Sequence, residues 1–207
     1  MLLSLMDWVV FIEFIAVIVS AIYGVLLATR TGMDFVGSFA VAFVAAFGGG
    51  TLRDLFLDRT PLFWIGNPHY PMTVFVICIL SSFFAKLLPR IQPILIYPDA
   101  VGMALFTTVG TAIALEAQDS WFIAALLGTI TGTFGGVLAD VICNEVPTLF
   151  KPSPLCATCA FTGAWIFILG TALTIPPTIV IVIATTIVVI FRLLAVHQNW
   201  QFPPLRN

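Results

Sequence analysis

Charged residues are scarce in this sequence of 207 residues. Lys, Arg, Asp and Glu together make up 9% of the chain, whereas a soluble domain carries about 25%. The net charge is −2, and no basic stripe is present that would attract nucleic acid. The sequence therefore lacks the polar surface of a soluble protein, and we expect no nucleic-acid partner.

The residue patterns of enzymes and metal proteins are also missing. We find no nucleophile beside a base, no phosphate-binding loop and no metal-ligand spacing, and His69 and His197 are isolated. Four cysteines lie in apolar runs, and the Cys156-x-x-Cys159 spacing has no second pair to complete a site. Buried, inert thiols are the favoured interpretation. We expect no enzyme, no metal and no cofactor.

Long apolar runs dominate instead, with 60% hydrophobic residues and a mean hydropathy of +1.12. A membrane-spanning helix needs about 20 such residues. Seven segments satisfy this length: 8–29, 34–57, 72–88, 94–115, 120–143, 155–173 and 176–196. They predict an all-α integral membrane protein with seven transmembrane helices in one transmembrane domain, residues 1–207, surrounded by the lipid bilayer.

The basic residues predict an orientation. If seven helices alternate in direction, Arg59 falls on one side and the other basic residues near the helix ends fall on the opposite side. These are Arg30, Lys86, Arg90, Lys151, Arg192 and Arg206. Because basic loops stay in the cytoplasm, we expect the N-terminus outside and the C-terminus inside, in the inner membrane of the cell. An aromatic belt is expected near the outer boundary, formed by Trp8, Trp64, Tyr70 and Trp121.

The chain repeats itself at an offset of 86 residues. Gly49-Gly50, Asp54 and Pro61 recur as Gly135-Gly136, Asp140 and Pro147, and Glu13 aligns with Asp99. Because each unit holds three helices, the second copy enters the membrane from the opposite face. We predict two inverted repeats, about 8–90 and 94–175, with a seventh helix at about 176–196. Inverted repeats of this kind indicate a transport site near the membrane midplane; a duplication that kept only packing residues is the alternative.

Consecutive glycines interrupt two of the predicted helices. Gly48, Gly49 and Gly50 lie within 34–57, and Gly135 and Gly136 lie within 120–143. Each glycine costs a helix about 1 kcal/mol relative to alanine, so these runs predict kinks that face protein or a water-filled path. Close packing through small residues is the other interpretation, and both are expected: one face packs while the helix bends.

Charged residues follow each glycine run. Arg53 and Asp54 come after the first and Asp140 after the second, where insertion of a charge costs about 2.5–3.5 kcal/mol. Such groups are expected to face water or one another, and Arg53 would pair with Asp54, Asp140 or Glu13. A structural ion pair between helices is the alternative. Glu13 and Asp99 are expected in the first turns of their helices, where the helix dipole favours carboxylates, with a structural or vestibular role.

These motifs resemble those of a known family. The string GGGTLRDLFLDRTPLFW at 48–64, with GGVLADVICNEVP at 135–147, resembles the prokaryotic trimeric intracellular cation (TRIC) channels. The resemblance implies a homotrimer of seven-helix protomers, each with a pore lined by kinked helices 34–57 and 120–143. It implies passage of K⁺ and Na⁺ through a constriction made by Thr51, Arg53, Asp54 and Asp140.

One position departs from the family pattern. Second repeats in the family often read GGVLRD, but here Ala139 replaces the arginine, so one half of the pore lacks a fixed positive charge. The Lys-Glu-Val signature of animal members is also absent, and their regulation by lipid and Ca²⁺ is not expected. The same sequence family includes proteins thought to move glycine or other small solutes, so a transporter is the alternative function. A purely structural scaffold would not need Arg53 or Asp140 at membrane depth.

Overall fold

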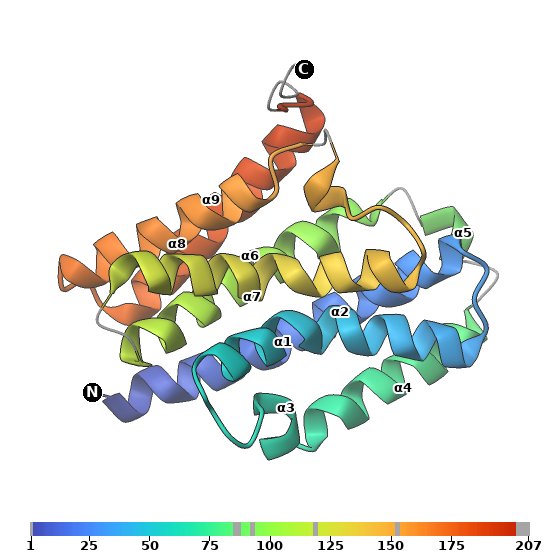
Figure 1. Cartoon of the computed structure of the whole chain (residues 1–207), viewed down its shortest axis with the longest axis horizontal. Coiled ribbons are helices and arrows are strands. Elements are labelled where there is room, and N and C mark those ends of the chain that lie inside the picture. The colour runs from blue at the N-terminus through green and yellow to red at the C-terminus, as the bar shows by residue number, and fades with distance from the viewer. Residues whose placement is uncertain (1, 85–87, 92–93, 118–119, 152–153, 202–207) are drawn as a thin grey trace.

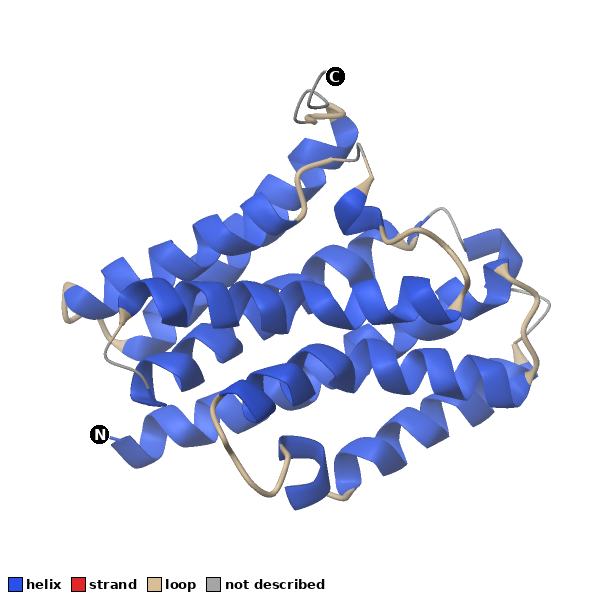
Figure 2. Cartoon of the chain, viewed as in Figure 1, coloured by secondary structure: helices blue, strands red, loops and turns tan. Residues whose placement is uncertain are grey.

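The fold, in a computed structural model, is described for residues 2–84, 88–91, 94–117, 120–151 and 154–201. Every regular element in these ranges is a helix, and none of them contains a strand (Figure 2). The long helices are α1 Leu2–Arg30, α2 Phe35–Phe56, α4 His69–Phe83, α6 Ile96–Ala117, α7 Trp121–Ile142, α8 Ala157–Ala172 and α9 Pro177–His197. Short helical segments are α3 Phe63–Gly66, α5 Leu88–Ile91 and η2 Thr148–Phe150. The all-α prediction is confirmed.

The helices have the length and surface of membrane spans. Five are long and apolar enough to cross a bilayer, namely α1 from Trp8 onward, α2, α6, α7 and α9, and the apolar helices α4 and α8 are shorter. Large apolar side chains lie on the outside of the molecule, as at Phe83 and Leu173. A water-soluble protein would bury most side chains of this kind. The expectation of a multi-pass membrane protein is therefore confirmed. The exact number of seven crossings stays a prediction.

Local sequence signals set the helix ends. The side chain of Asp34 accepts a hydrogen bond from the Gly37 N–H at 2.8 Å and begins α2, and Ser120 does the same for α7. Pro177 is the first residue of α9, a position where a missing N–H costs nothing. Helices α2, α6, α7, α8 and α9 all begin and end within two residues of the predicted bounds.

Two boundaries differ from the prediction. Helix α1 begins at Leu2 instead of residue 8, so Glu13 lies about three turns inside it and not in its first turn. The helix predicted at 72–88 is α4 His69–Phe83, preceded by the unpredicted short helix α3, and residues 85–87 lie outside the described part of the chain. Asp99 does lie in the first turn of α6, as expected.

Four helices make the centre of the molecule. Helix α1 packs on α2 and α6, and α7 packs on α2 and α6 (Figure 1). Helix α4 covers α1 and α2 along one edge, while α8 and α9 cover α6 and α7 along the opposite edge (Figure 1). Each of the two predicted repeats therefore contributes two central helices and one peripheral helix, and α9 lies beside the second.

Helices α2 and α7 are the same element placed 86 residues apart. Their bounds, Phe35–Phe56 and Trp121–Ile142, differ by that offset at both ends. Both end in the same way: the Arg59 N–H donates to the Asp54 carbonyl at 2.8 Å, and the Glu145 N–H donates to the Asp140 carbonyl at 2.9 Å. The sequence repeat is thus also a repeat of local structure.

Some charged and aromatic residues occupy other places than expected. Arg192 lies inside α9 and is buried, so it is not a loop charge and does not report orientation; Lys86 and Arg206 lie outside the described residues. Tyr70 is fully buried, and its hydroxyl donates to the Val10 carbonyl at 3.2 Å, so it belongs to the core and not to an aromatic belt. Trp8 and Trp121 are exposed, as a belt requires.

Candidate functional site

A buried cluster of charges joins α1 to α2. Arg53 is fully buried, and its Nη1 lies 3.2 Å from the Oε1 of Glu13. Its Nε donates to the Oδ1 of Asp54 at 2.9 Å, and its guanidinium carbon lies 5.2 Å from the centre of the Phe63 ring. The cluster neutralises a charge that would be very costly alone at this depth. Of the three predicted partners, Arg53 contacts Glu13 and Asp54.

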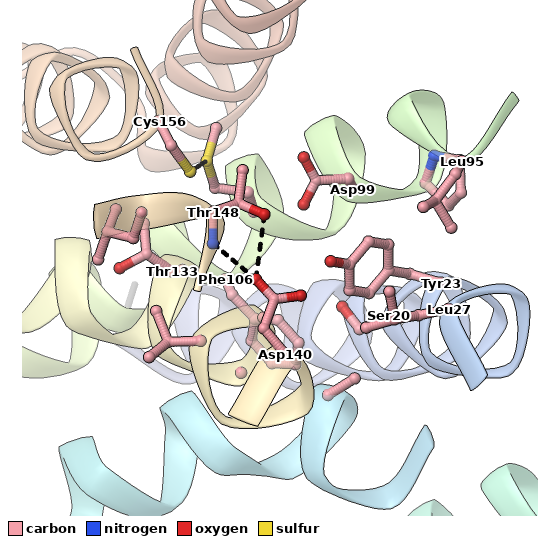
Figure 3. Close-up of a pocket in the computed structure, with 18 of the residues that line it drawn as sticks. Ser20, Tyr23, Leu27, Leu95, Asp99, Phe106, Thr133, Asp140, Thr148 and Cys156 are labelled. Carbon is pink, nitrogen blue, oxygen red and sulfur yellow. Dashed lines mark hydrogen bonds between the residues drawn. The ribbon is translucent and has the colours of Figure 1, made fainter. Parts of the chain in front are cut away.

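The aspartates after the two glycine runs have matching roles. Asp54 accepts a hydrogen bond through Oδ2 from the Phe63 N–H at 2.8 Å, and Asp140 accepts one through Oδ2 from the Thr148 N–H at 2.8 Å. Asp140 also accepts from the Thr148 hydroxyl at 3.0 Å (Figure 3). Each carboxylate therefore fixes the short helical segment that follows its helix, α3 in one case and η2 in the other.

Thr51 is separated from these charges. Its hydroxyl accepts a hydrogen bond from the Trp64 Nε1–H at 3.1 Å. Trp64 itself is partly buried and packs on Phe43 and Phe47, with ring centres 5.2 and 5.8 Å away, and its place in an aromatic belt stays a prediction. Thr51 thus helps to hold the short helix α3 against α2.

A cavity of about 350 Å³ lies between α1, α6, α7 and η2. Tyr23, Asp99 and Asp140 point into the same space from three different elements (Figure 3). Arg30 and Glu145 lie at its exposed rim. Arg53, Asp54 and Thr51 do not line it, so the structure separates Asp140 from the other residues of the predicted constriction.

The cavity occupies the place that large side chains fill in the first half of the chain. There, the Phe63 ring packs so tightly on Gly50 that a Cβ at this glycine would lie 2.5 Å from it, and Phe47 and Tyr70 are buried beside it. At the offset of 86 residues these three positions hold smaller residues, and all three line the cavity. They are Thr133 for Phe47, Leu149 for Phe63 and Cys156 for Tyr70.

A second ion pair lies at one wall of the cavity. The Nη2 of Arg192, on α9, lies 3.1 Å from the Oδ2 of Asp99, on α6, and the Nη1 donates to the Pro154 carbonyl at 2.8 Å. The pair ties the last helix to the second half of the chain. Sequence reasoning placed Asp99 correctly in its helix but missed Arg192, because a lone arginine near the end of an apolar run looks like a loop charge.

Glycines allow α2 and α7 to cross at close range. A Cβ at Gly49 would meet the Thr131 carbonyl oxygen, and a Cβ at Gly135 would meet the Ala45 carbonyl oxygen. Both helices continue through their glycine runs. The close-packing interpretation of the glycines is therefore supported by these contacts, and the kinks stay a prediction.

The cysteines do not form a reactive or metal-binding set. Cys78, Cys143 and Cys159 are buried free thiols, and Cys156 is a partly buried free thiol at the cavity. Within the residues that the structure describes, no group of three His, Cys, Asp or Glu side chains is placed to hold a metal ion.

The chain was then compared with known proteins. A family model described as "Glycine transporter" matches it twice, over residues 10–86 and 96–172. The chain belongs to this family. The two matched segments begin 86 residues apart, the same offset as the sequence repeat.

Curated relatives of the chain are bacterial membrane proteins. A UPF0126 membrane protein of Vibrio cholerae is 38% identical over 153 residues, which are 73% of this chain and 64% of that protein, so the match spans less than two thirds of its length. The UPF0126 inner membrane protein YadS of Escherichia coli is 31% identical over 200 residues, 94% of this chain and 95% of YadS.

Solved structures of prokaryotic TRIC channels share the fold. One, described in work on conductance through TRIC cation channels, has a TM-score of 0.86 at 28% identity and covers 95% of this chain and 97% of its own. The TRIC trimeric intracellular cation channel orthologue from Rhodobacter sphaeroides has a TM-score of 0.87 at 29% identity and covers 93% and 98%. The expected resemblance to the TRIC family is confirmed, and these structural relatives are cation channels, not enzymes.

Proposed function

We propose that this protein is a cation channel of the inner membrane that conducts K⁺ and Na⁺ through a path in each protomer of a homotrimer. The observation that carries the proposal is the cavity beside Asp140, which is open to solvent at one rim. The Asp140 carboxylate is held at the end of a membrane-spanning helix by Thr148. The likeness to TRIC cation channels supports it, because those proteins have the same fold over almost their whole length. A carboxylate that faces a water-filled cavity inside the membrane attracts cations and repels anions.

The proposed architecture has seven crossings in a single transmembrane domain, residues 1–207. Helices α4 and α8 complete the five long spans, because they are apolar and occupy matching places against the central helices. The N-terminus lies outside and the C-terminus in the cytoplasm. This orientation rests on the remaining basic residues near the predicted inner side, Arg30, Lys86, Arg90, Lys151 and Arg206, against Arg59.

The two halves are proposed to be inverted repeats, about 8–90 and 94–175, with α9 added. The reciprocal contacts support this. Gly49 meets Thr131, and Gly135 meets Ala45. At the offset of 86 residues Gly49 corresponds to Gly135 and Ala45 corresponds to Thr131, so the two contacts are equivalent. Such an exchange is expected where a pseudo-two-fold axis passes between α2 and α7. Bends at Gly48–Gly50 and at Gly135–Gly136 belong to the same proposal.

Arg53 is proposed to plug the first half of the path. A fixed positive charge repels a passing cation by about 4 kcal/mol at 4 Å and an effective dielectric of 20. Glu13 and Asp54 neutralise Arg53 in this structure, and Phe63 covers it, so the first half is filled while the second half holds a cavity. Conduction requires the Arg53 side chain to move aside, with Thr51 and Asp54 at the constriction.

Glycine transport is the second candidate, because one observation favours it. The same cavity is lined by the carboxylates of Asp99 and Asp140 and by the guanidinium of Arg192. A small zwitterion carries an ammonium group and a carboxylate, which these groups could bind together. The description of the family model agrees with this candidate.

Purified protein in planar bilayers under a KCl gradient separates the two functions. Discrete unitary currents with a cation-selective reversal potential are expected for the channel. Silent bilayers, together with saturable glycine uptake into proteoliposomes, would replace the channel with the transporter.

A further inference from the structure

The two halves of the chain neutralise equivalent carboxylates with arginines from different places. In the first half, Arg53 of α2 binds Glu13 of α1. At the offset of 86 residues, Glu13 corresponds to Asp99 and Arg53 to Ala139, so this arginine is missing from the second half. Asp99 nevertheless has an arginine partner, because Arg192 reaches it from α9, a helix that belongs to neither repeat.

We propose that Arg192 is a positioning residue that replaces the missing arginine at Ala139 from the wall of the cavity. It neutralises Asp99 there, so the positive charge at this wall is already balanced by a carboxylate. A permeating monovalent cation can then occupy the cavity at Asp140. The proposal rests on the proposed channel function and assigns a part in it to α9.

Side-chain volume supports this role. In the first half, Arg53 runs from α2 to Glu13 beneath the Phe63 ring, through the space that corresponds to the cavity. Ala139 is fully buried next to the cavity-lining Asp140 and does not itself line the cavity, so an arginine there, following the course of Arg53, is expected to reach Asp99 by entering the cavity. Because the cation is supplied by Arg192 at the wall instead, the charge of Asp99 is balanced and the space stays open.

Charge supports it as well. Without Arg192, Asp99 and Asp140 would both face the cavity with no cation between them. Two unpaired carboxylates at this depth would hold a cation strongly, whereas conduction requires a site that the ion can leave. Arg192 cancels one carboxylate, and the buried Asp140 charge remains inside the cavity to attract the ion.

Relocation of the arginine tests the proposal without measuring ion current. We compare the full-length protein with Arg192→Gln, Ala139→Arg and the double variant Ala139→Arg/Arg192→Gln. The control pair is Ala139→Leu alone and with Arg192→Gln, since leucine adds volume but cannot bind Asp99. Arg192→Gln is expected to lower the thermal midpoint because it leaves Asp99 unpaired. The arginine at 139 should recover most of that loss in the double variant, and leucine should recover none.

Access to the cavity is the second measurement. Cys156 lines the cavity, so a small cationic thiosulfonate reagent should modify it in membranes, with the site resolved by mass spectrometry. In Ala139→Arg the rate should fall by about tenfold or more, because a like charge and extra volume fill the cavity.

The proposal is overturned if the double variant is no more stable than Arg192→Gln, or if Ala139→Arg leaves the rate of Cys156 modification unchanged. If Arg192→Gln does not fold, folding of the double variant alone decides the stability question. Wild-type cation currents with a failed relocation would overturn only the role of Arg192. Successful relocation with silent bilayers would overturn the channel and leave the charge replacement intact.

Discussion

The backbone carbonyl of Thr131 in α7 lies directly against Gly49 in α2, leaving no room for a side chain at that position. The reverse contact, between Gly135 and the Ala45 carbonyl, lies on the same pair of helices. These contacts bring the two halves of the chain together at the centre of the molecule. They also change the meaning of the glycine runs, which serve first as contact points between helices.

Alanine at Gly49 should therefore destabilise the protein. Its Cβ would meet the Thr131 carbonyl, so α2 and α7 would have to separate, and overpacking of this kind costs about 1–3 kcal/mol. The thermal midpoint in detergent measures the effect. Gly136→Ala is the matched control, because the nearest atom to a Cβ there is the Tyr23 hydroxyl at 3.9 Å. Equal midpoints for the two variants would show that the crossing is not tight.

The sequence alone suggests that Gly49→Leu would block a passage and leave expression intact. The contact with the Thr131 carbonyl replaces this expectation with a loss of folded protein. A blocking leucine belongs at Gly136 instead, which lines the cavity. Gly136→Leu should fold like Gly136→Ala yet reduce single-channel conductance in bilayers. Full conductance of a folded Gly136→Leu protein would place the ion path elsewhere.

Removal of Arg53 should affect stability and conduction in opposite directions. Arg53→Ala leaves Glu13 buried without its cation and leaves Asp54 with only the half-exposed Arg59, 3.8 Å away, and breaking such a cluster costs about 3–5 kcal/mol. The double variant Glu13→Gln/Arg53→Ala removes one of the stranded charges and should regain part of that stability. In bilayers, the double variant should show a higher cation conductance or open probability than wild type. Wild-type currents would mean that Arg53 only joins α1 to α2.

The orientation is testable with reporters. A fusion after Asn207 should report from the cytoplasm and a fusion ahead of Met1 from outside, because the loop arginines and lysines collect on one side. Alkaline phosphatase and green fluorescent protein give opposite signals in the two compartments. Two ends that report from the same side would contradict the seven crossings.

The helices were predictable from the sequence because their signals are local. Asp34 and Ser120 cap α2 and α7, and apolar runs of the right length define their interiors. The start of α1 was missed because hydropathy locates the buried part of a helix, and Leu2–Asp7 extends the helix beyond the run that begins at Trp8. The short helix α3 was missed because its position depends on the hydrogen bond from the Phe63 N–H to Asp54.

The site was only partly predictable. Charges are conspicuous in an apolar segment, so Arg53, Asp54 and Asp140 were predicted. Asp54, Asp140 and Glu13 were all predicted as partners of Arg53, and the structure pairs it with Asp54 and Glu13. Which half is filled depends on side chains that meet across helices, as Phe63 meets Gly50. No single stretch of sequence contains that information. The same holds for the contact of Arg192 with Asp99, which joins residues 93 positions apart.

The central claim is that a cation passes beside Asp140, and the reversal potential under a KCl gradient tests it most directly. Asp140→Asn keeps an oxygen that can accept the Thr148 hydrogen bonds but removes the charge. The matched variant Glu145→Gln removes a carboxylate at the exposed rim, where solvent screens it. Wild type should show a cation-selective reversal potential, Asp140→Asn should shift it toward zero, and Glu145→Gln should change it little. A folded Asp140→Asn protein with the wild-type reversal potential would contradict the account.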